Sequence, residues 1–183
     1  GNHPPIMYHL TAVDMNGDRA ADLVVSFGDT IRVFNHSGNP LPGWPQPNGV
    51  GFSQIGPAVG DLDGDGSPEV VAYNIMGDGK VRIFQSNGAL VPGWPRYISP
   101  AMRTAIDDID GNGTRDVITT DGGGIINVFD IQGNMLPGWP TAMSGVSLLS
   151  APAIGDVDRD GRKEIAVVEL QAPCRLALYQ SNG

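Results

Sequence analysis

The sequence predicts an all-β fold built from repeated units, and three observations support this prediction. An acidic segment that contains glycine returns along the chain at nearly constant spacing. A short run of β-branched and apolar residues, of strand length, follows each acidic segment. Gly and Pro are abundant, at 26 and 15 of the 183 residues, which favours many short strands joined by tight turns.

The acidic segment occurs four times. The copies read VDMNGDRAADLV, GDLDGDGSPEVV, DDIDGNGTRDVI and GDVDRDGRKEIA. Their first aspartates are separated by 47, 47 and 48 residues, a regularity typical of repeat architectures. We call these segments acidic loops 1 to 4 and number the positions of each from its first aspartate. Acidic loops 1 to 4 are residues 14–22, 61–69, 108–116 and 156–164.

A second repeated block follows each acidic loop. It reads IRVFNHSGNPLPGWP, VRIFQSNGALVPGWP and INVFDIQGNMLPGWP, with a shorter LALYQSNG at the end of the sequence. One unit therefore offers four runs of strand length, such as PAVGD, EVVAY, KVRIF and ALVPGWP. Four short antiparallel strands per unit predict the blades of a β-propeller.

The repeats predict a single repeat domain over residues 1–183. The expected blades are approximately 7–45, 55–95, 101–140 and 150–183. The fourth blade stops before its fourth strand, so about four blades are expected, the last of them incomplete. We expect either that the chain is part of a larger propeller or that two copies associate to complete one ring.

Oxygen-bearing side chains occupy positions 1, 3, 5 and 9 of the acidic loops. In a tight loop bent at glycine, these positions can direct their oxygens at one centre, and Ca²⁺ prefers six to eight oxygen ligands. The residue type at position 7 varies between the copies, as expected if that position contributes only its backbone carbonyl. An EF-hand is excluded, because position 12 of acidic loop 2 is Ala72 within a strand-like run.

The pattern D-x-D-G-D-G-x-x-[DE], followed by an apolar strand, resembles the calcium loop of FG-GAP/VCBS repeats found in integrin α-subunit propellers. The resemblance implies a loop between the first and second strands of a blade and up to four Ca²⁺, one per blade. It also implies that other ligands bind at other faces of the propeller. The implied metal ligands are Asp14, Asn16, Asp18, Asp22, Asp61, Asp63, Asp65, Glu69, Asp108, Asp110, Asn112, Asp116, Asp156, Asp158, Asp160 and Glu164.

The four loops are not equivalent. Arg19 and Arg159 stand where other copies have Gly, so a strained bend is expected in loop 1. Asn16 and Asn112 replace carboxylates, so we expect loop 2 to bind most strongly and loop 1 most weakly. The loops contain 14 of the 20 acidic residues, and four Ca²⁺ would change the formal charge from -9 to -1.

Composition excludes several function classes. The charge of -9, without a basic cluster, argues against nucleic acid binding, and no apolar run is long enough for membrane insertion. No nucleophile elbow or zinc-protease motif is present, so the sequence predicts no catalytic site. Trp44, Trp94 and Trp139 recur in identical PGWP contexts, which favours packing between blades over sugar stacking.

The expected function is a non-catalytic, calcium-binding interaction module of a secreted or cell-surface protein. Its partner would be a protein or glycan ligand, bound for adhesion or scaffolding. The alternatives are an ancillary propeller domain of a secreted hydrolase or polysaccharide lyase, or a lectin. Fold analogy alone does not identify the ligand.

Overall fold

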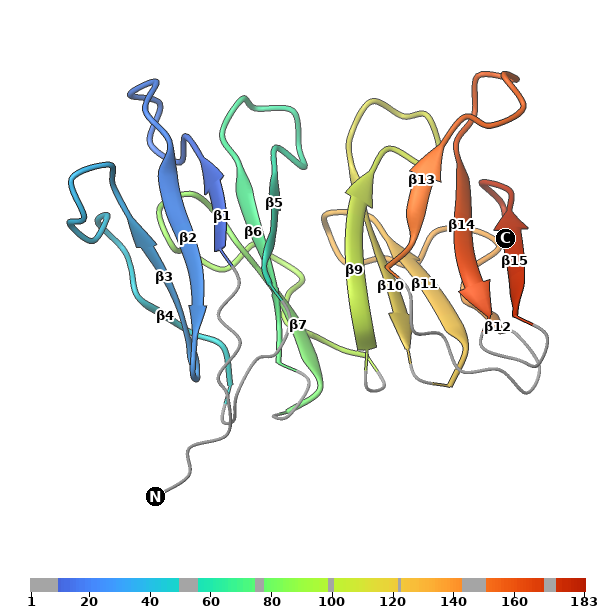
Figure 1. Ribbon diagram of the computed structural model, residues 1–183, viewed down its shortest axis with the longest axis horizontal. Coiled ribbons are helices and arrows are strands. Elements are labelled where there is room, and N and C mark those ends of the chain that lie inside the picture. Colours follow the sequence, from blue (N-terminus) through green and yellow to red (C-terminus); the bar gives the residue numbers. More distant parts are fainter. Residues whose placement is uncertain are drawn as a thin grey trace. The chain divides into compact units, whose positions relative to one another are not determined.

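The computed structural model describes residues 10–49, 56–74, 78–98, 101–121, 123–142, 151–169 and 174–183. All regular structure in these ranges is β, which confirms the predicted fold class (Figure 1). The strands form four separate antiparallel sheets, numbered 1 to 4 in chain order. The predicted blade starts at residues 7–9, 55 and 150 lie outside the described residues.

The chain divides into two compact units, and the first comprises Gly1–Asp61 with Gly66–Ile98. It contains sheets 1 and 2, and in each sheet the strands are hydrogen-bonded in chain order. The strands of sheet 1 are β1 (Leu10–Val13), β2 (Asp22–Phe27), β3 (Thr30–Phe34) and β4 (Gln46–Pro47). The strands of sheet 2 are β5 (Ala58–Gly60), β6 (Glu69–Tyr73), β7 (Lys80–Phe84) and β8 (Arg96–Tyr97).

The second unit comprises Ser99–Gly183 with Leu62–Asp65 and contains sheets 3 and 4. Sheet 4 has three strands within the described residues, as expected for an incomplete last blade. The strands of sheet 3 are β9 (Ala101–Asp107), β10 (Asp116–Asp121), β11 (Ile125–Phe129) and β12 (Thr141–Ala142). The strands of sheet 4 are β13 (Ala153–Gly155), β14 (Glu164–Glu169) and β15 (Arg175–Tyr179).

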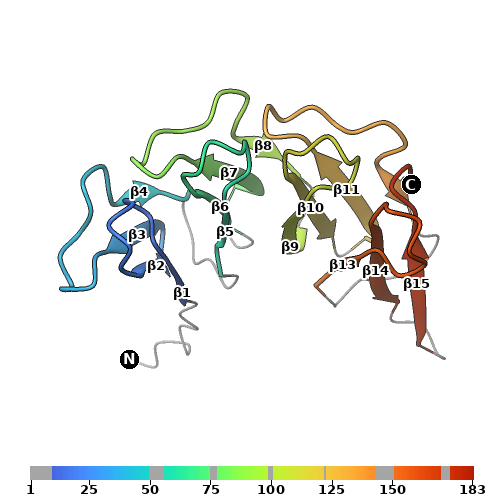
Figure 2. The same cartoon turned by 90° about the horizontal axis from the view of Figure 1, so that it is seen from above.

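The two sheets of each unit pack face to face, and their first strands lie side by side. Strand β1 contacts β5 in the first unit, and β9 contacts β13 in the second (Figure 2). One apolar cluster fills the space between sheets 1 and 2 and includes Val24 and Val70. An equivalent cluster between sheets 3 and 4 includes Ile118 and Ile165. Each unit is therefore held together by burial of apolar side chains between neighbouring sheets.

The fourth strands lie later in the sequence than predicted. The expected strand ALVPGWP makes only an isolated bridge between Phe84 and Leu90, and β8 begins after it, at Arg96. The same shift places β4 and β12 after their PGWP motifs. Proline lacks the N–H that a strand ladder requires, so the PGWP segment forms a turn instead of pairing. In this turn the N–H of Trp94 donates to the carbonyl of Val91 at 3.2 Å.

Candidate metal-binding loops

Each acidic loop connects the first and second strands of its sheet, as the family resemblance implies (Figure 1). Position 9 is the first residue of the second strand, and it pairs with the last residue of the first strand. Asp116 thus pairs with Asp107 across β10 and β9, and Glu164 pairs with Gly155 across β14 and β13. The two strands therefore fix both ends of the loop.

The carboxylate at position 1 accepts hydrogen bonds from the backbone of its own loop. Asp108 Oδ1 accepts from the N–H groups of Gly111 and Asn112 at 2.8 and 3.1 Å, and Oδ2 accepts from Gly113 at 3.0 Å. Asp156 accepts from Asp160 and Gly161 at 3.1 and 3.0 Å. These bonds fold the loop around the carboxylate at position 1.

The same contacts affect the ionisation of Asp14. Desolvation raises the pKa of this carboxyl, but hydrogen bonds from the N–H groups of Arg19, Gly17, Asn16 and Asp18 outweigh it and lower the pKa below its usual value. The loop backbone therefore stabilises the charged form of the carboxylate.

In loops 1, 3 and 4 the carboxylate at position 9 is buried and only half satisfied. One oxygen accepts the N–H of position 2 at 2.9 Å in loops 1, 3 and 4, as in the bond from Ile109 to Asp116 Oδ2. The other oxygen is also buried and has no hydrogen-bond partner among the described residues. These oxygens are Asp22 Oδ1, Asp116 Oδ1 and Glu164 Oε1.

An unpaired buried carboxylate oxygen is costly, and Asp116 responds to it. Burial, together with the nearby carboxylates of Asp110 and Asp108, raises the pKa of Asp116 to about 6, although the N–H of Ile109 opposes the increase. A cation at this point would supply the missing partner and offset the repulsion between the carboxylates.

The structure brings positions 1, 3 and 9 together in three loops. In each of these groups one oxygen per residue lies within 4.8 Å of the others. The groups are Asp61, Asp63 and Glu69; Asp108, Asp110 and Asp116; and Asp156, Asp158 and Glu164. In loop 1 the corresponding residues are Asp14, Asn16 and Asp22, so an amide replaces one carboxylate.

Position 5 is not a member of these groups. In loops 1, 3 and 4 one of its oxygens accepts the N–H of position 7, at 2.7 to 2.8 Å, which closes a short turn. The residues at position 5 are Asp18, Asp65, Asn112 and Asp160. The side chain predicted as a metal ligand at position 5 therefore also closes a turn within the loop.

The backbone bends as the glycine pattern predicts. Positions 4 and 6 have positive φ in all four loops, including the two places where the sequence has Arg. Arg19 has φ of 69° and Arg159 has φ of 64°, both in the left-handed region that disfavours side chains. The expected strain in loop 1 is confirmed, and loop 4 shares it.

Trp44 and Trp139 pack between neighbouring sheets, as predicted. Trp44 is 7% exposed, lies edge-on to Phe84 with ring centroids 5.8 Å apart, and donates from Nε1 to the carbonyl of Ser86 at 3.0 Å. Trp139 likewise donates to the carbonyl of Ser181 at 3.3 Å. Because the rings are buried, they offer little surface for stacking on a sugar.

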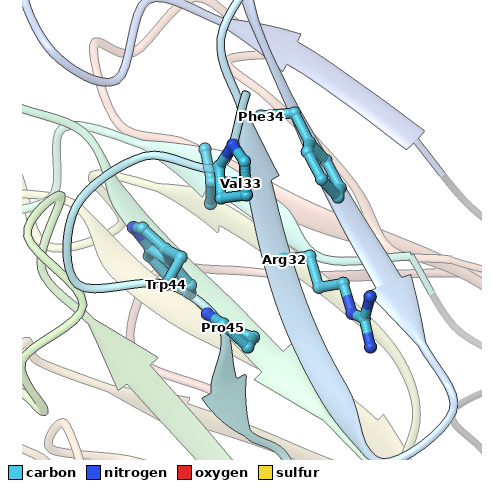
Figure 3. Close-up of a pocket in the computed structure, with 6 residues that line it drawn as sticks. Arg32, Val33, Phe34, Trp44 and Pro45 are labelled. Atoms are coloured by element: carbon cyan, nitrogen blue, oxygen red, sulfur yellow. The ribbon is translucent and has the colours of Figure 1, made fainter. Parts of the chain in front are cut away.

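The side chains around Trp44 are apolar or aromatic on one side and cationic on the other. Figure 3 shows Arg32 and Phe34 on β3, with Trp44 and Pro45 beside them, around a small hollow. The Arg32 guanidinium lies 4.7 Å from the ring centroid of Phe27. We assign this hollow no function.

One ionic contact near the loops has no counterpart in the sequence analysis. Lys163, at position 8 of loop 4, pairs with Asp107, the residue before loop 3. Position 8 differs in type between the copies, and the partners are far apart in sequence. No local pattern could have indicated this pair.

Together, the antiparallel sheets and their acidic loops define a propeller-type repeat protein. The model of the FG-GAP-like repeat matches residues 14–72 and 108–167. The chain belongs to the FG-GAP-like repeat family. A comparison with curated protein sequences gives no match. The described residues include no helix able to cross a bilayer.

Solved structures share the fold at low sequence identity. The V. cholerae biofilm matrix protein Bap1 is 19% identical, with a TM-score of 0.69, over 95% of this chain and 27% of its own. The Pseudomonas aeruginosa PilY1 C-terminal domain is 16% identical, with a TM-score of 0.63, over 90% of this chain and 43% of its own.

A third similar structure is BBS1N in complex with ARL6DN. It is 10% identical, with a TM-score of 0.62, over 98% of this chain and 57% of its own. The chain thus spans between about a quarter and somewhat more than half of the length of these three structures. At these identities the likeness concerns the fold alone.

Proposed function

We propose that the chain is a calcium-binding, non-catalytic interaction module of an extracellular or cell-surface protein, acting in adhesion or scaffolding. The observation that carries the proposal is the buried, unpaired carboxylate oxygen at position 9 in loops 1, 3 and 4. In loops 3 and 4 it belongs to a group of three carboxylates. A cluster of this kind suits a hard divalent cation that binds oxygen.

The ligands that we propose follow the loop positions. Positions 1, 3 and 9 would bind the ion through side chains, and position 5 would use the oxygen not engaged in its turn. In loop 1, Asn16 would supply an amide oxygen. Bound Ca²⁺ would neutralise the loops and stabilise each sheet at the junction of its first two strands.

The adhesive role and the location rest on the family and on two similar structures. One of these is a biofilm matrix protein, and the PilY1 structure is a C-terminal domain, so in both cases the fold occurs within a larger chain. Calcium sites in extracellular modules commonly have dissociation constants of about 10⁻⁴ to 10⁻³ M, which suits millimolar extracellular calcium. We propose a protein or glycan as the ligand.

Thermal unfolding in chelator and in millimolar calcium tests the calcium proposal. Each occupied site is expected to add on the order of 1 kcal/mol to the free energy of unfolding, so calcium raises the melting temperature. Magnesium at the same concentration controls for ionic strength, because it prefers a smaller octahedral site. A melting curve that is identical in chelator and calcium would reject the proposal.

A matched variant separates metal binding from loop folding. Asp63, Asp110 and Asp158 occupy position 3, are exposed, and can be changed together to Asn. Asn16 in loop 1 shows that an amide keeps the local hydrogen bond, because its Oδ1 accepts the N–H of Asp18 at 2.9 Å. The triple variant should melt no lower than the wild type in chelator but lose most of the gain from calcium.

The control is Asp29→Asn, which removes a charge from an exposed residue outside the loops. This variant should keep the full calcium effect. If the triple variant and Asp29→Asn responded equally to calcium, the position 3 carboxylates would not be ligands.

A further inference from the structure

One ion pair connects loops 3 and 4 at the points where they join their strands. Lys163, the residue before Glu164 in loop 4, pairs with Asp107, the residue before Asp108 in loop 3. Both side chains are partly buried, since Lys163 is 38% and Asp107 28% exposed. The two loops lie at the same end of the second unit (Figure 1). A residue of one proposed calcium loop therefore places its charge beside another.

Asp107 is an additional carboxylate next to the proposed site in loop 3. It pairs with Asp116 across β9 and β10, and paired residues of an antiparallel ladder direct their side chains to the same face of the sheet. Its Oδ1 also accepts the N–H of Asp108 at 3.0 Å. Asp107 therefore lies beside two of the proposed metal ligands of loop 3, at positions 1 and 9.

This pair of charges is specific to loops 3 and 4. Loop 3 is the only one of the four that an acid precedes, and loop 4 is the only one with a lysine at position 8. In the other sheets the residue that pairs with position 9 is uncharged. These residues are Val13, Gly60 and Gly155. The extra acid and its lysine partner thus occur together, once in the chain.

Position 8 also contacts the preceding loop in loop 3. The N–H of Arg115, at this position, donates to the carbonyl of Leu62 in loop 2 at 2.8 Å. In loop 4 the residue at position 8 makes its contact through the charged side chain of Lys163. Position 8 is therefore a point at which one loop acts on the loop before it.

We propose that Lys163 of loop 4 sets the calcium affinity of loop 3 through Asp107. The inference rests on the proposed function, because it requires that loop 3 binds calcium. The Asp107 carboxylate attracts a cation to loop 3, and the Lys163 ammonium cancels this attraction, since like charges repel at short range. Without calcium, the same lysine offsets the repulsion between Asp107 and the carboxylates of loop 3.

A purely mechanical role of the ion pair gives a different expectation. If the pair only held the two loops together, loss of either residue would disturb loop 3 and weaken its calcium binding. If the pair acts through its charges, loss of Lys163 strengthens calcium binding by loop 3 and loss of Asp107 weakens it. The direction of the two changes therefore separates the two roles.

Calcium titrations of the full chain, followed by the amide NMR signals of residues 108–116, test the proposal. Lys163→Gln should lower the calcium concentration at the midpoint for loop 3 by roughly three- to tenfold, and Asp107→Asn should raise it by a similar factor. The double variant has no net charge at the pair, as in the wild type, so its midpoint should return close to the wild-type value.

Lys80→Gln is the matched control. Lys80 is the only other lysine of the chain and is the first residue of β7, outside the acidic loops. Its replacement removes the same charge and should leave the midpoint for loop 3 unchanged. All titrations use one ionic strength, because salt screens the interaction between charges. The amide spectrum of each variant in chelator verifies that it is folded.

Midpoints for loop 3 that stay unchanged in both single variants, or that move in the same direction, would overturn the proposal and leave calcium binding by the loops intact. An equal shift in Lys80→Gln and Lys163→Gln would also overturn it, because the net charge of the chain would then be the cause. A wild type without saturable shifts at residues 108–116 would overturn both this proposal and the proposed calcium site in loop 3.

Discussion

At the scale of single residues, the acidic loops are defined by their hydrogen bonds as much as by their carboxylates. Position 1 organises the backbone, and position 9 connects the loop to the second strand. Position 3 is exposed, and in each loop it accepts the N–H of position 5. The side chains at positions 1, 3, 5 and 9 therefore all contribute to the fold of the loop, and a cation would act mainly on a preformed arrangement.

The spacing of the acidic residues predicts which carboxylates come together, because the loop is short and bends at fixed positions. It does not predict that in loops 1, 3 and 4 the carboxylate at position 9 leaves one buried oxygen unpaired. That depends on the burial of these side chains, and Asp116 and Glu164 are 0% and 1% exposed. Burial by residues distant in sequence has no local signal.

The strain at Arg159 leads to a prediction about stability. Arg159→Gly should be more stable than Arg159→Ala by about 1 kcal/mol, because only Gly adopts the left-handed backbone without cost. The Ala variant removes the same charge and side chain, so the difference isolates the backbone term. Urea denaturation in chelator measures the stability of both variants. Equal stabilities would show that the backbone at position 4 is not strained.

At the scale of structural elements, the PGWP turn connects neighbouring sheets. Its glycine lies against the turn of the next sheet, so that a Cβ at Gly138 would be 1.8 Å from the carbonyl oxygen of Asn182. Its tryptophan donates to the carbonyl of Ser181 in the same turn. The motif therefore joins sheets 3 and 4 by close backbone approach and by one indole hydrogen bond.

The sequence predicts the second and third strands well, since their apolar runs are continuous and the turns between repeats contain Gly. It places the fourth strand wrongly, because ALVPGWP has strand-like length and composition. The two prolines of this segment lack the N–H groups that a strand ladder needs. The residues that pair as the fourth strand therefore come after the prolines. The acceptors of the Trp44 and Trp139 indole N–H groups lie in the following repeat, beyond any local pattern.

The close approach at Gly138 predicts a large effect of adding one methyl group. Gly138→Ala should destabilise the protein by about 1–3 kcal/mol more than Gly111→Ala, because both have positive φ but only Gly138 is in contact with backbone. Gly111 has no atom within 4 Å of its added Cβ and serves as the control. Similar losses in urea denaturation would contradict the close contact.

Trp139 allows a milder test of the same connection. Trp139→Phe keeps an aromatic ring near Tyr179 but removes the hydrogen bond to the Ser181 carbonyl. The expected loss is about 1–3 kcal/mol, since the carbonyl is left without this donor and the ring is smaller. The measurement is the free energy of unfolding of the variant and of the wild type. Equal values would mean that water replaces the indole as the hydrogen-bond donor to the carbonyl.

At the scale of the whole molecule, the repeats place most of the acidic residues in four loops at corresponding positions. A formal charge of -9 concentrated in this way opposes folding unless cations neutralise it. Calcium would therefore link the stability of every sheet to its concentration in the surroundings. Under the proposed function, this coupling would make the module most stable where calcium is abundant.

Amide NMR spectra recorded during a calcium titration of chelator-treated protein examine all four loops at once. We predict saturable shifts for the amides of residues 14–22, 61–69, 108–116 and 156–164, with loop 2 saturating first and loop 1 last. The turn at residues 28–29, which lies at the other end of β2 from loop 1, should change little. Shifts that do not saturate, or that scatter over the surface without favouring the four loops, would show that the loops do not bind calcium.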